Sequence, residues 1–184
     1  MKKLTLTVLI LAAVAFLVAY FGSPFLAVRQ LVDAAEAGDA AKLERRVDFP
    51  AFRASLKEEL NARLAGEMTR KLSARDSALG GLGMLLAPSL VSGAVDALVT
   101  PNSVSAMVRE ARAPNPRDAV APPADTRPEG DKTEIRQSYR YRSFDTFVLT
   151  LTDEKRPDRT LDLLMERRGL FDWKLAGIDL TPDE

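Results

Sequence analysis

The hydrophobic pattern begins with one long apolar run, Leu4–Phe21, which holds eighteen residues and no charge. At about 1.5 Å per residue, a helix of this length spans roughly 27 Å, close to the hydrocarbon thickness of a bilayer. Tyr20 and Phe21 close the run with aromatic rings, which are common at membrane interfaces. The pattern therefore predicts a transmembrane anchor over residues 1–22.

The charges around this run predict its orientation. Lys2 and Lys3 precede it, and only Arg29 follows closely, so the N-terminus is expected in the cytoplasm and the C-terminal domain outside it. For a bacterium this means the inner membrane, with a periplasmic domain. A cleaved signal peptide is the alternative. The run exceeds the usual length of about 7–15 residues and its exit lacks a small-x-small site, so we expect an uncleaved anchor.

Apolar residues then recur with helical spacing over residues 23–112, which predicts a helical region. Ser23 and Pro24 suit an N-cap and a first helical position, so a new helix is expected to begin there. Gly38 suits the left-handed end of that helix, and Asp39 suits the cap of the next. A third, long amphipathic helix is expected to begin at Pro50. Its apolar stripe consists of Phe52, Leu56, Leu60, Leu64, Met68 and Leu72.

Two later segments have unusual compositions. Residues 78–99 are apolar and rich in small side chains, which is consistent with buried or interfacial helical turns or with a second membrane segment. Asp96 and the central Pro88 favour the buried or interfacial alternative. After a helix beginning at Thr100-Pro101, residues 113–131 are rich in proline and have no apolar period, so an extended linker or long loop is expected.

The last part, residues 132–184, alternates apolar and polar side chains, as antiparallel strands do. Inward positions are expected at Phe147, Leu149, Leu151, Leu161, Leu163, Met165, Phe171, Trp173 and Leu175. A turn is expected at Ser143–Asp145, a polar hairpin loop over 153–159, and a bulge at Ala176-Gly177. The predicted fold class is α+β: an N-terminal transmembrane helix, a helical region, then a three- to four-stranded antiparallel meander packed on helices.

Composition narrows the chemistry. The 184 residues include no cysteine and no histidine, and the formal net charge is +0. Thiol redox chemistry, Ser-His-Asp and Cys-His catalysis, and histidine metal sites are therefore excluded for this sequence. A chain without net charge has no global field that attracts nucleic acid. We predict no catalytic residue, no metal site, no cofactor and no nucleic-acid partner.

Two groups of side chains are candidates for binding. The basic stripe Arg136, Arg140 and Arg142 suits an anion such as phosphate or a lipid headgroup, although cross-strand pairing with Asp162 or Glu166 explains it more simply. The aromatic set could line an apolar ligand pocket between sheet and helices, although core packing explains the same side chains. This set is Phe144, Phe147, Phe171 and Trp173.

Asp48 and Arg53 form a third candidate, because a carboxylate and a guanidinium five residues apart could hold a ligand. Capping of the third helix explains Asp48 more simply, since its side chain can accept a free backbone N–H at the positive end of the helix dipole. We therefore expect a structural role for Asp48.

Three stretches together resemble a known family. They are Ser23–Ser55 with Val47-Asp48-Phe49-Pro50, the Leu98-Val99-Thr100-Pro101 start, and Tyr139–Leu180 with Glu166-Arg167-Arg168-Gly169-Leu170-Phe171-x-Trp173. They resemble bacterial proteins grouped as domain of unknown function 2939. The resemblance implies a small, membrane-anchored bacterial protein and supplies no activity or catalytic residue. The order of helices before a meander is also similar to cone-shaped folds of the nuclear transport factor 2-like and cystatin-like kind.

The sequence thus favours a non-enzymatic, single-pass membrane protein, held in the bilayer through residues 4–21. Its extracytoplasmic domain would act as an interaction module whose partner is an envelope protein or a lipid. The alternative is a domain that binds a small apolar ligand or lipid between sheet and helices. A hydrolase that uses carboxylates alone has no specific sequence feature in its favour.

Overall fold

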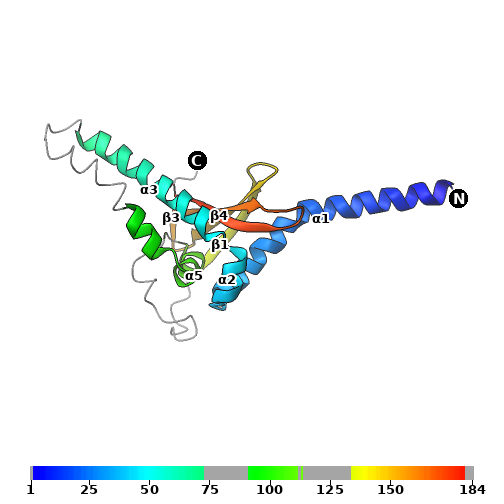
Figure 1. Ribbon diagram of the computed structural model, residues 1–184, viewed down its shortest axis with the longest axis horizontal. Helices are drawn as coiled ribbons and strands as arrows, with labels where there is room; N and C mark the ends of the chain where they lie inside the picture. The colour runs from blue at the N-terminus through cyan, green and yellow to red at the C-terminus, as the bar shows by residue number, and fades with distance from the viewer. Residues whose placement is uncertain (1, 73–90, 112, 114–133, 181–184) are drawn as a thin grey trace.

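The computed structural model (Figure 1) describes residues 2–72, 91–111, 113 and 134–180. The expectations for 78–90 and for all but Ala113 of the linker lie outside the described residues. The helices are α1 (Lys2–Glu36), α2 (Ala40–Arg46), α3 (Phe49–Leu72), a helix over 91–98, and α5 (Pro101–Glu110). The strands are β1 (Ile135–Tyr141), β2 (Thr146–Asp153), β3 (Arg156–Arg167) and β4 (Trp173–Asp179). The expected α+β class is confirmed.

The four strands form an antiparallel meander in the order β1-β2-β3-β4. Leu149 of β2 lies opposite Leu163 of β3, as the alternation predicts, so the apolar side chains share one face. The expected hairpin loop over 153–159 is wrong in length, because β3 already begins at Arg156. The Asp153 carboxylate accepts the Lys155 N–H at 2.9 Å. This hydrogen bond closes a tight turn directly before Arg156, the first residue of β3.

The bulge predicted at Ala176-Gly177 is confirmed. Gly177 lies opposite Leu164 and Leu175 lies opposite Met165, so Ala176 is the extra residue on β4. Ser55 of α3 reaches this point, and its Oγ accepts the Ile178 N–H at 3.1 Å. A Cβ on Gly177 would lie 2.9 Å from that Oγ, so glycine permits the close approach of helix and strand.

The expected helix start at Ser23-Pro24 is wrong, because α1 runs unbroken from Lys2 to Glu36 with Pro24 inside it. Proline has no N–H to donate to the carbonyl four residues earlier, that of Tyr20. The Ser23 hydroxyl donates to this Tyr20 carbonyl instead, at 2.8 Å. The same hydroxyl accepts the Trp173 indole N–H, also at 2.8 Å. The backbone group that proline leaves free is thus satisfied, and the helix continues.

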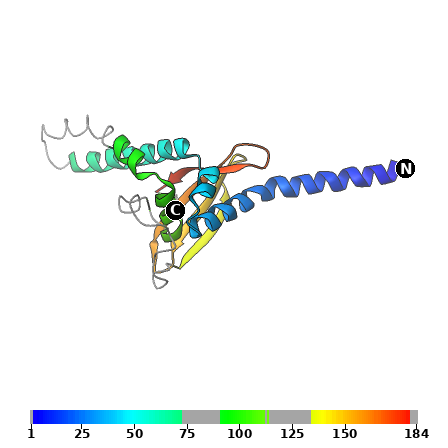
Figure 2. The same ribbon diagram turned by 60° about the horizontal axis from the view of Figure 1, so that its bottom comes forward.

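Two halves of α1 have different surroundings. Val28, Leu31 and Ala35 of its second half are buried in the core, whereas the apolar side chains before Gly22 are exposed. Figures 1 and 2 show the first half projecting away from the rest of the domain. Among the described helices, α1 alone is long and apolar enough to cross a membrane, judged by length and composition.

The core forms between the inner face of the sheet and the helices. Its buried side chains come from α1, α2, α3, α5, the 91–98 helix and strands β2 to β4. Val95 of the 91–98 helix is fully buried, in line with the buried alternative for that part of the 78–99 segment. Phe52 and Leu56 of α3 are buried and Leu60 packs against the core, whereas Leu64 is exposed, so the expected apolar stripe packs from Phe52 to Leu60 and is exposed at Leu64.

The helix ends predicted at Gly38-Asp39 and at Thr100-Pro101 are confirmed. Gly38 has φ 63°, and the Asp39 carboxylate caps α2 by accepting the Lys42 N–H. Thr100 and Ser103 form a capping box at the start of α5. These caps fix where the chain turns, and they bring the start of α3 close to the start of α5.

Candidate functional site

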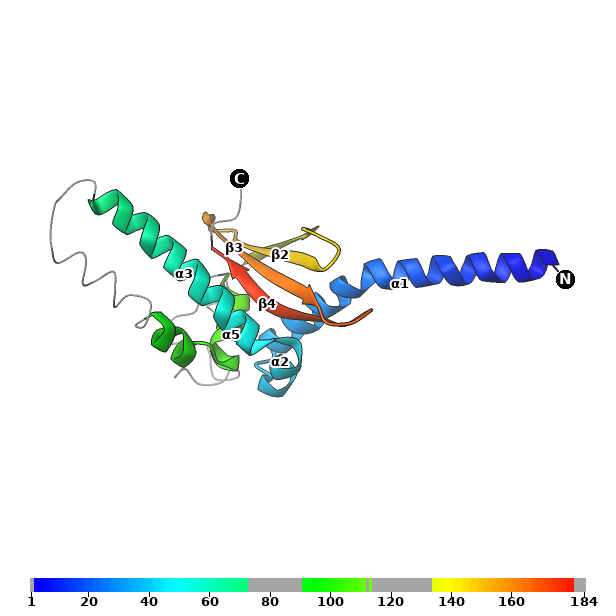
Figure 3. The same cartoon turned by 45° about the horizontal axis from the view of Figure 1, so that its top comes forward.

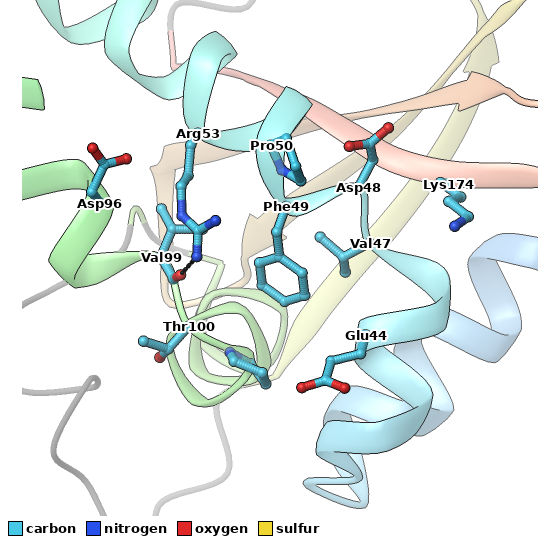
Figure 4. A pocket seen from close by; sticks show the side chains of 11 residues that line it. Glu44, Val47, Asp48, Phe49, Pro50, Arg53, Asp96, Val99, Thr100 and Lys174 are labelled. Carbon is cyan, nitrogen blue, oxygen red and sulfur yellow. Dashed lines mark hydrogen bonds between the residues drawn. The ribbon is translucent and has the colours of Figure 1, made fainter.

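A groove of about 550 Å³ lies between the starts of α3 and α5 (Figure 4). Three chain segments and β4 supply its lining. The lining residues are Glu44, Val47, Asp48, Phe49, Pro50, Arg53, Asp96, Val99, Thr100, Pro101 and Lys174. The groove therefore contains the Asp48–Arg53 candidate from the sequence, together with side chains that are distant along the chain.

Asp48 is fixed from several directions. Its N–H donates to the Leu175 carbonyl at 2.8 Å, which ties the start of α3 to the edge of β4. Its carboxylate accepts the Ala51 N–H at 3.2 Å as the expected cap, and pairs with Arg168 at 2.9 Å. Burial works to raise the pKa of Asp48, but the Ala51 N–H and Arg168 outweigh it and hold that pKa below its ordinary value. Asp48 therefore stays ionised, and its role is structural: it caps α3 and pairs with Arg168.

Arg53 crosses the groove from α3. Its Nη2 donates to the Val99 carbonyl at 2.9 Å, and its guanidinium lies 5.6 Å from the centre of the Phe49 ring. Its Nε is buried and has no hydrogen-bond partner among the described residues. Figure 4 shows Arg53 pointing across the groove toward the α5 side. The groove therefore holds a fixed cation next to an aromatic ring.

The other charges of the groove have both signs. Asp96 pairs with Lys57 at 2.8 Å, and Figure 4 shows Glu44 and Lys174 at the part of the groove away from Asp96. No group of three potential metal ligands occurs in the described part of the chain. The groove thus combines charged side chains of both signs with the apolar side chains of Val47, Phe49 and Val99.

The three arginines of the basic stripe each lie beside a carboxylate. Arg140 pairs with Asp162 at 2.6 Å, as the simpler explanation expected, and Asp162 is only 1% exposed. Arg136 lies 3.6 Å from Glu154, and Arg142 lies 3.4 Å from Asp179. An anion would have to compete with these carboxylates, and a contact to an anion stays a prediction.

The structure separates the aromatic set into two pairs. Phe147 and Trp173 are fully buried, with ring centroids 6.4 Å apart, so they belong to the core. Phe144 is 75% exposed and Phe171 is 47% exposed. The expected inward position of Phe171 is wrong, because β4 begins only at Trp173 and Phe171 lies in the turn before it. A ligand pocket lined by these four rings stays a prediction.

A second cluster, around Arg167, was missed by the sequence analysis. Its guanidinium lies 4.0 Å from the ring centre of Tyr20 and 4.2 Å from that of Trp173. It also donates to the carbonyls of Phe144 and Leu170. The Glu166–Trp173 motif contains this arginine, but sequence alone does not reveal that its partners lie on α1 and in another turn.

Comparison with known proteins gives one match. The model of a family described as "Protein of unknown function (DUF2939)" matches residues 13–107, just over half of the chain. No curated protein and no solved structure matches the chain. The likeness to nuclear transport factor 2-like folds therefore stays a prediction.

Proposed function

Because the chain belongs to the DUF2939 family, whose description assigns no activity, we propose a function from its geometry: a membrane-anchored, non-enzymatic binding module. The observation that carries the proposal is the unbroken helix α1. Its exposed apolar half suits a bilayer, and its second half is a core element of the domain. A cleavage near Phe21 would remove side chains that contact the sheet, which favours a retained anchor.

The proposed topology follows from the flanking charges. Lys2 and Lys3 lie on the cytoplasmic side, and the domain lies outside the cytoplasm, at the bacterial inner membrane. An alkaline phosphatase fused to the C-terminus should be active, and a fluorescent protein that matures only in the cytoplasm should stay dark there. The opposite pair of results would overturn the topology.

The proposed binding site is the groove between α3 and α5, and its occupant is a segment of another envelope protein. The fixed guanidinium of Arg53, with its unpartnered Nε, and the adjacent Phe49 ring supply a charged and an aromatic contact. Carboxylates and Lys174 around them suit a ligand with polar side chains of both signs. The absence of cysteine and histidine from the sequence favours binding over catalysis.

Site-specific photo-crosslinking in native membranes tests this site. A photoreactive residue at Glu44 or Lys174, both in the groove, should give one discrete protein adduct. The same residue at Ser138, exposed on β1, is the matched control and should give none. Arg53→Gln should weaken the groove adducts. Equal adducts at all three positions, or none at either groove position, would refute the site.

Native mass spectrometry of the gently extracted protein separates this proposal from the small-ligand alternative. The protein mass alone, or that mass with a second protein, agrees with an interaction module. A retained small apolar molecule would replace the proposal with a ligand-binding function. The full-length chain, including α1, is the species to measure.

A further inference from the structure

Two turns of the sheet carry exposed apolar side chains at the same end of the meander. They connect β1 to β2 and β3 to β4, and Figure 3 shows both pointing toward the side where the free half of α1 leaves the domain. Phe144 in the first turn is 75% exposed, and Leu170 and Phe171 in the second are 63% and 47% exposed. We call these three residues the apex.

The apex lies level with the apolar run of α1. The Phe171 ring packs edge-on against that of Phe16, with centroids 5.7 Å apart. Phe16 precedes Phe21 by five residues, which places it about 7–8 Å further along the helix toward the N-terminus. If the membrane ended at Phe16, only Leu4–Phe16 would cross it, or roughly 20 Å against the ~30 Å of hydrocarbon. The anchor therefore spans best when the apex enters the membrane.

We propose that the apex inserts into the interfacial layer of the bilayer, beside the protein's own anchor. The inference rests on the proposed function in one respect, because it requires α1 to cross the membrane. It adds a second membrane contact, which the turns of the sheet make. Two contacts fix the orientation of the domain relative to the bilayer. The occupant of this exposed apolar surface is then lipid and no second protein is needed to cover it.

Arg167 supplies hydrogen-bond donors to the backbone carbonyls of both apex turns. Backbone carbonyls in a poorly hydrated layer must find donors within the protein. The Arg167 guanidinium donates to the Leu170 carbonyl at 2.7 Å and to the Phe144 carbonyl at 3.1 Å, so it serves both turns. Its side chain is only 8% exposed and lies over the Tyr20 ring. One buried cation thus joins both turns to α1.

The surroundings of the apex match a membrane interface. Tyr141 donates its hydroxyl to the Phe21 carbonyl at 2.7 Å, and its ring packs against that of Phe21. Tyr139 and Phe25 form a further contact, and all four rings are partly exposed. Rings with an apolar body and a polar tip prefer the headgroup level of a bilayer. These four rings lie between α1 and β1 at the point where α1 leaves the domain.

Single cysteines test the proposal directly, since the chain has none of its own. Phe144→Cys and Leu170→Cys place a label in each turn. Lys155→Cys is the matched control, because Lys155 is an exposed residue in the turn between β2 and β3, at the other end of the sheet. Val14→Cys, in the exposed part of α1, reports on the anchor itself. All four replaced side chains are exposed, so the fold should survive, as far-UV circular dichroism will check.

Each full-length variant is labelled with an environment-sensitive fluorophore and reconstituted into phosphatidylglycerol–phosphatidylethanolamine vesicles with or without brominated acyl chains. Brominated lipid should quench labels at positions 14, 144 and 170 at least twofold more than the label at Lys155. Quenching at position 14 alone would overturn the apex proposal and leave the anchor intact. A blue-shifted apex label that bromine does not quench would indicate a protein cover, and would also overturn it. No quenching at position 14 would refute the anchor, and with it both proposals.

Discussion

Replacing Ser23 by alanine should strongly destabilise the protein, because one hydroxyl joins α1 to β4. The Ser23 hydroxyl donates to the Tyr20 carbonyl and accepts the Trp173 indole N–H, each at 2.8 Å. Pro24 cannot serve that carbonyl, since proline lacks an N–H. Ser23→Ala therefore leaves both a carbonyl and an indole N–H without their partner.

The expected loss follows from the burial of these groups. Trp173 is fully buried, and an orphaned buried donor costs about 1–3 kcal/mol. The Tyr20 carbonyl lies in a region that is only partly buried by the protein, so the loss of its partner should add less. We expect the free energy of unfolding to fall by about 2–4 kcal/mol, a factor of roughly 30 to 1,000 in the folding equilibrium.

The assay is equilibrium unfolding of the full chain in mild detergent, followed by circular dichroism of the sheet. Ser23→Thr is the control, because threonine keeps a hydroxyl that can reach the same carbonyl, and it should cost less than about 1 kcal/mol. Trp173→Phe removes the indole donor. In that background Ser23→Ala should cost about 1–2 kcal/mol less than in the native chain.

Two results would refute this reasoning. One is a loss below about 0.5 kcal/mol on Ser23→Ala, which is the size of an ordinary surface substitution. The other is an equal loss with tryptophan and with phenylalanine at position 173. Either result would mean that the hydroxyl does not couple the anchor helix to the sheet.

Four further predictions concern other parts of the fold. Gly177→Ala should cost about 1–3 kcal/mol in thermal unfolding, because its Cβ would lie 2.9 Å from a hydroxyl of α3. Gly66→Ala, in a helix with open space around it, should instead stabilise by about 0.5–1 kcal/mol. Arg140→Gln should cost about 1–3 kcal/mol in denaturant unfolding, since it removes the charged partner of the buried Asp162 carboxylate and leaves that carboxylate only the Thr150 hydroxyl among its partners in the described part of the chain, whereas Arg136→Gln breaks an exposed pair and should cost under about 1 kcal/mol. Because the pKa of Asp48 is lower in the folded state, its contribution is present above pH 3.8 and is lost as the pH falls through that lowered pKa. A pH series of unfolding midpoints should show this loss, and Asp48→Asn should flatten it.

The features that the sequence predicts well are local. Gly38 with Asp39, and Thr100 with Pro101, mark helix ends because a cap involves groups within three or four residues of each other. The bulge at Gly177 is likewise visible as a slip in the alternation of one strand. In each case the physical cause lies inside the segment that shows the pattern.

The features that the sequence misses depend on distant partners. Pro24 resembles a helix start until Ser23 is known to serve the free carbonyl and to bind an indole 150 residues away. The groove has the same property. Asp48 and Arg53 are near in sequence, but Val99 and Lys174 complete the lining from other segments. Periodicity within one element contains no information on such contacts.

The unbroken α1 has a consequence for binding. If the helix ended at Ser23, a flexible linker would join the proposed anchor to the domain, and the groove would sample many orientations relative to the membrane. Instead the proposed anchor and the core share one helix, and Arg167 joins that helix to two turns of the sheet. The groove lies at the starts of α3 and α5, and its Asp48 pairs with Arg168 in the turn between β3 and β4, so the groove is tied to the same end of the sheet as that turn. For the proposed anchored protein, this rigid attachment would hold the groove in one orientation relative to the bilayer, so the proposed partner would lose less rotational freedom on binding.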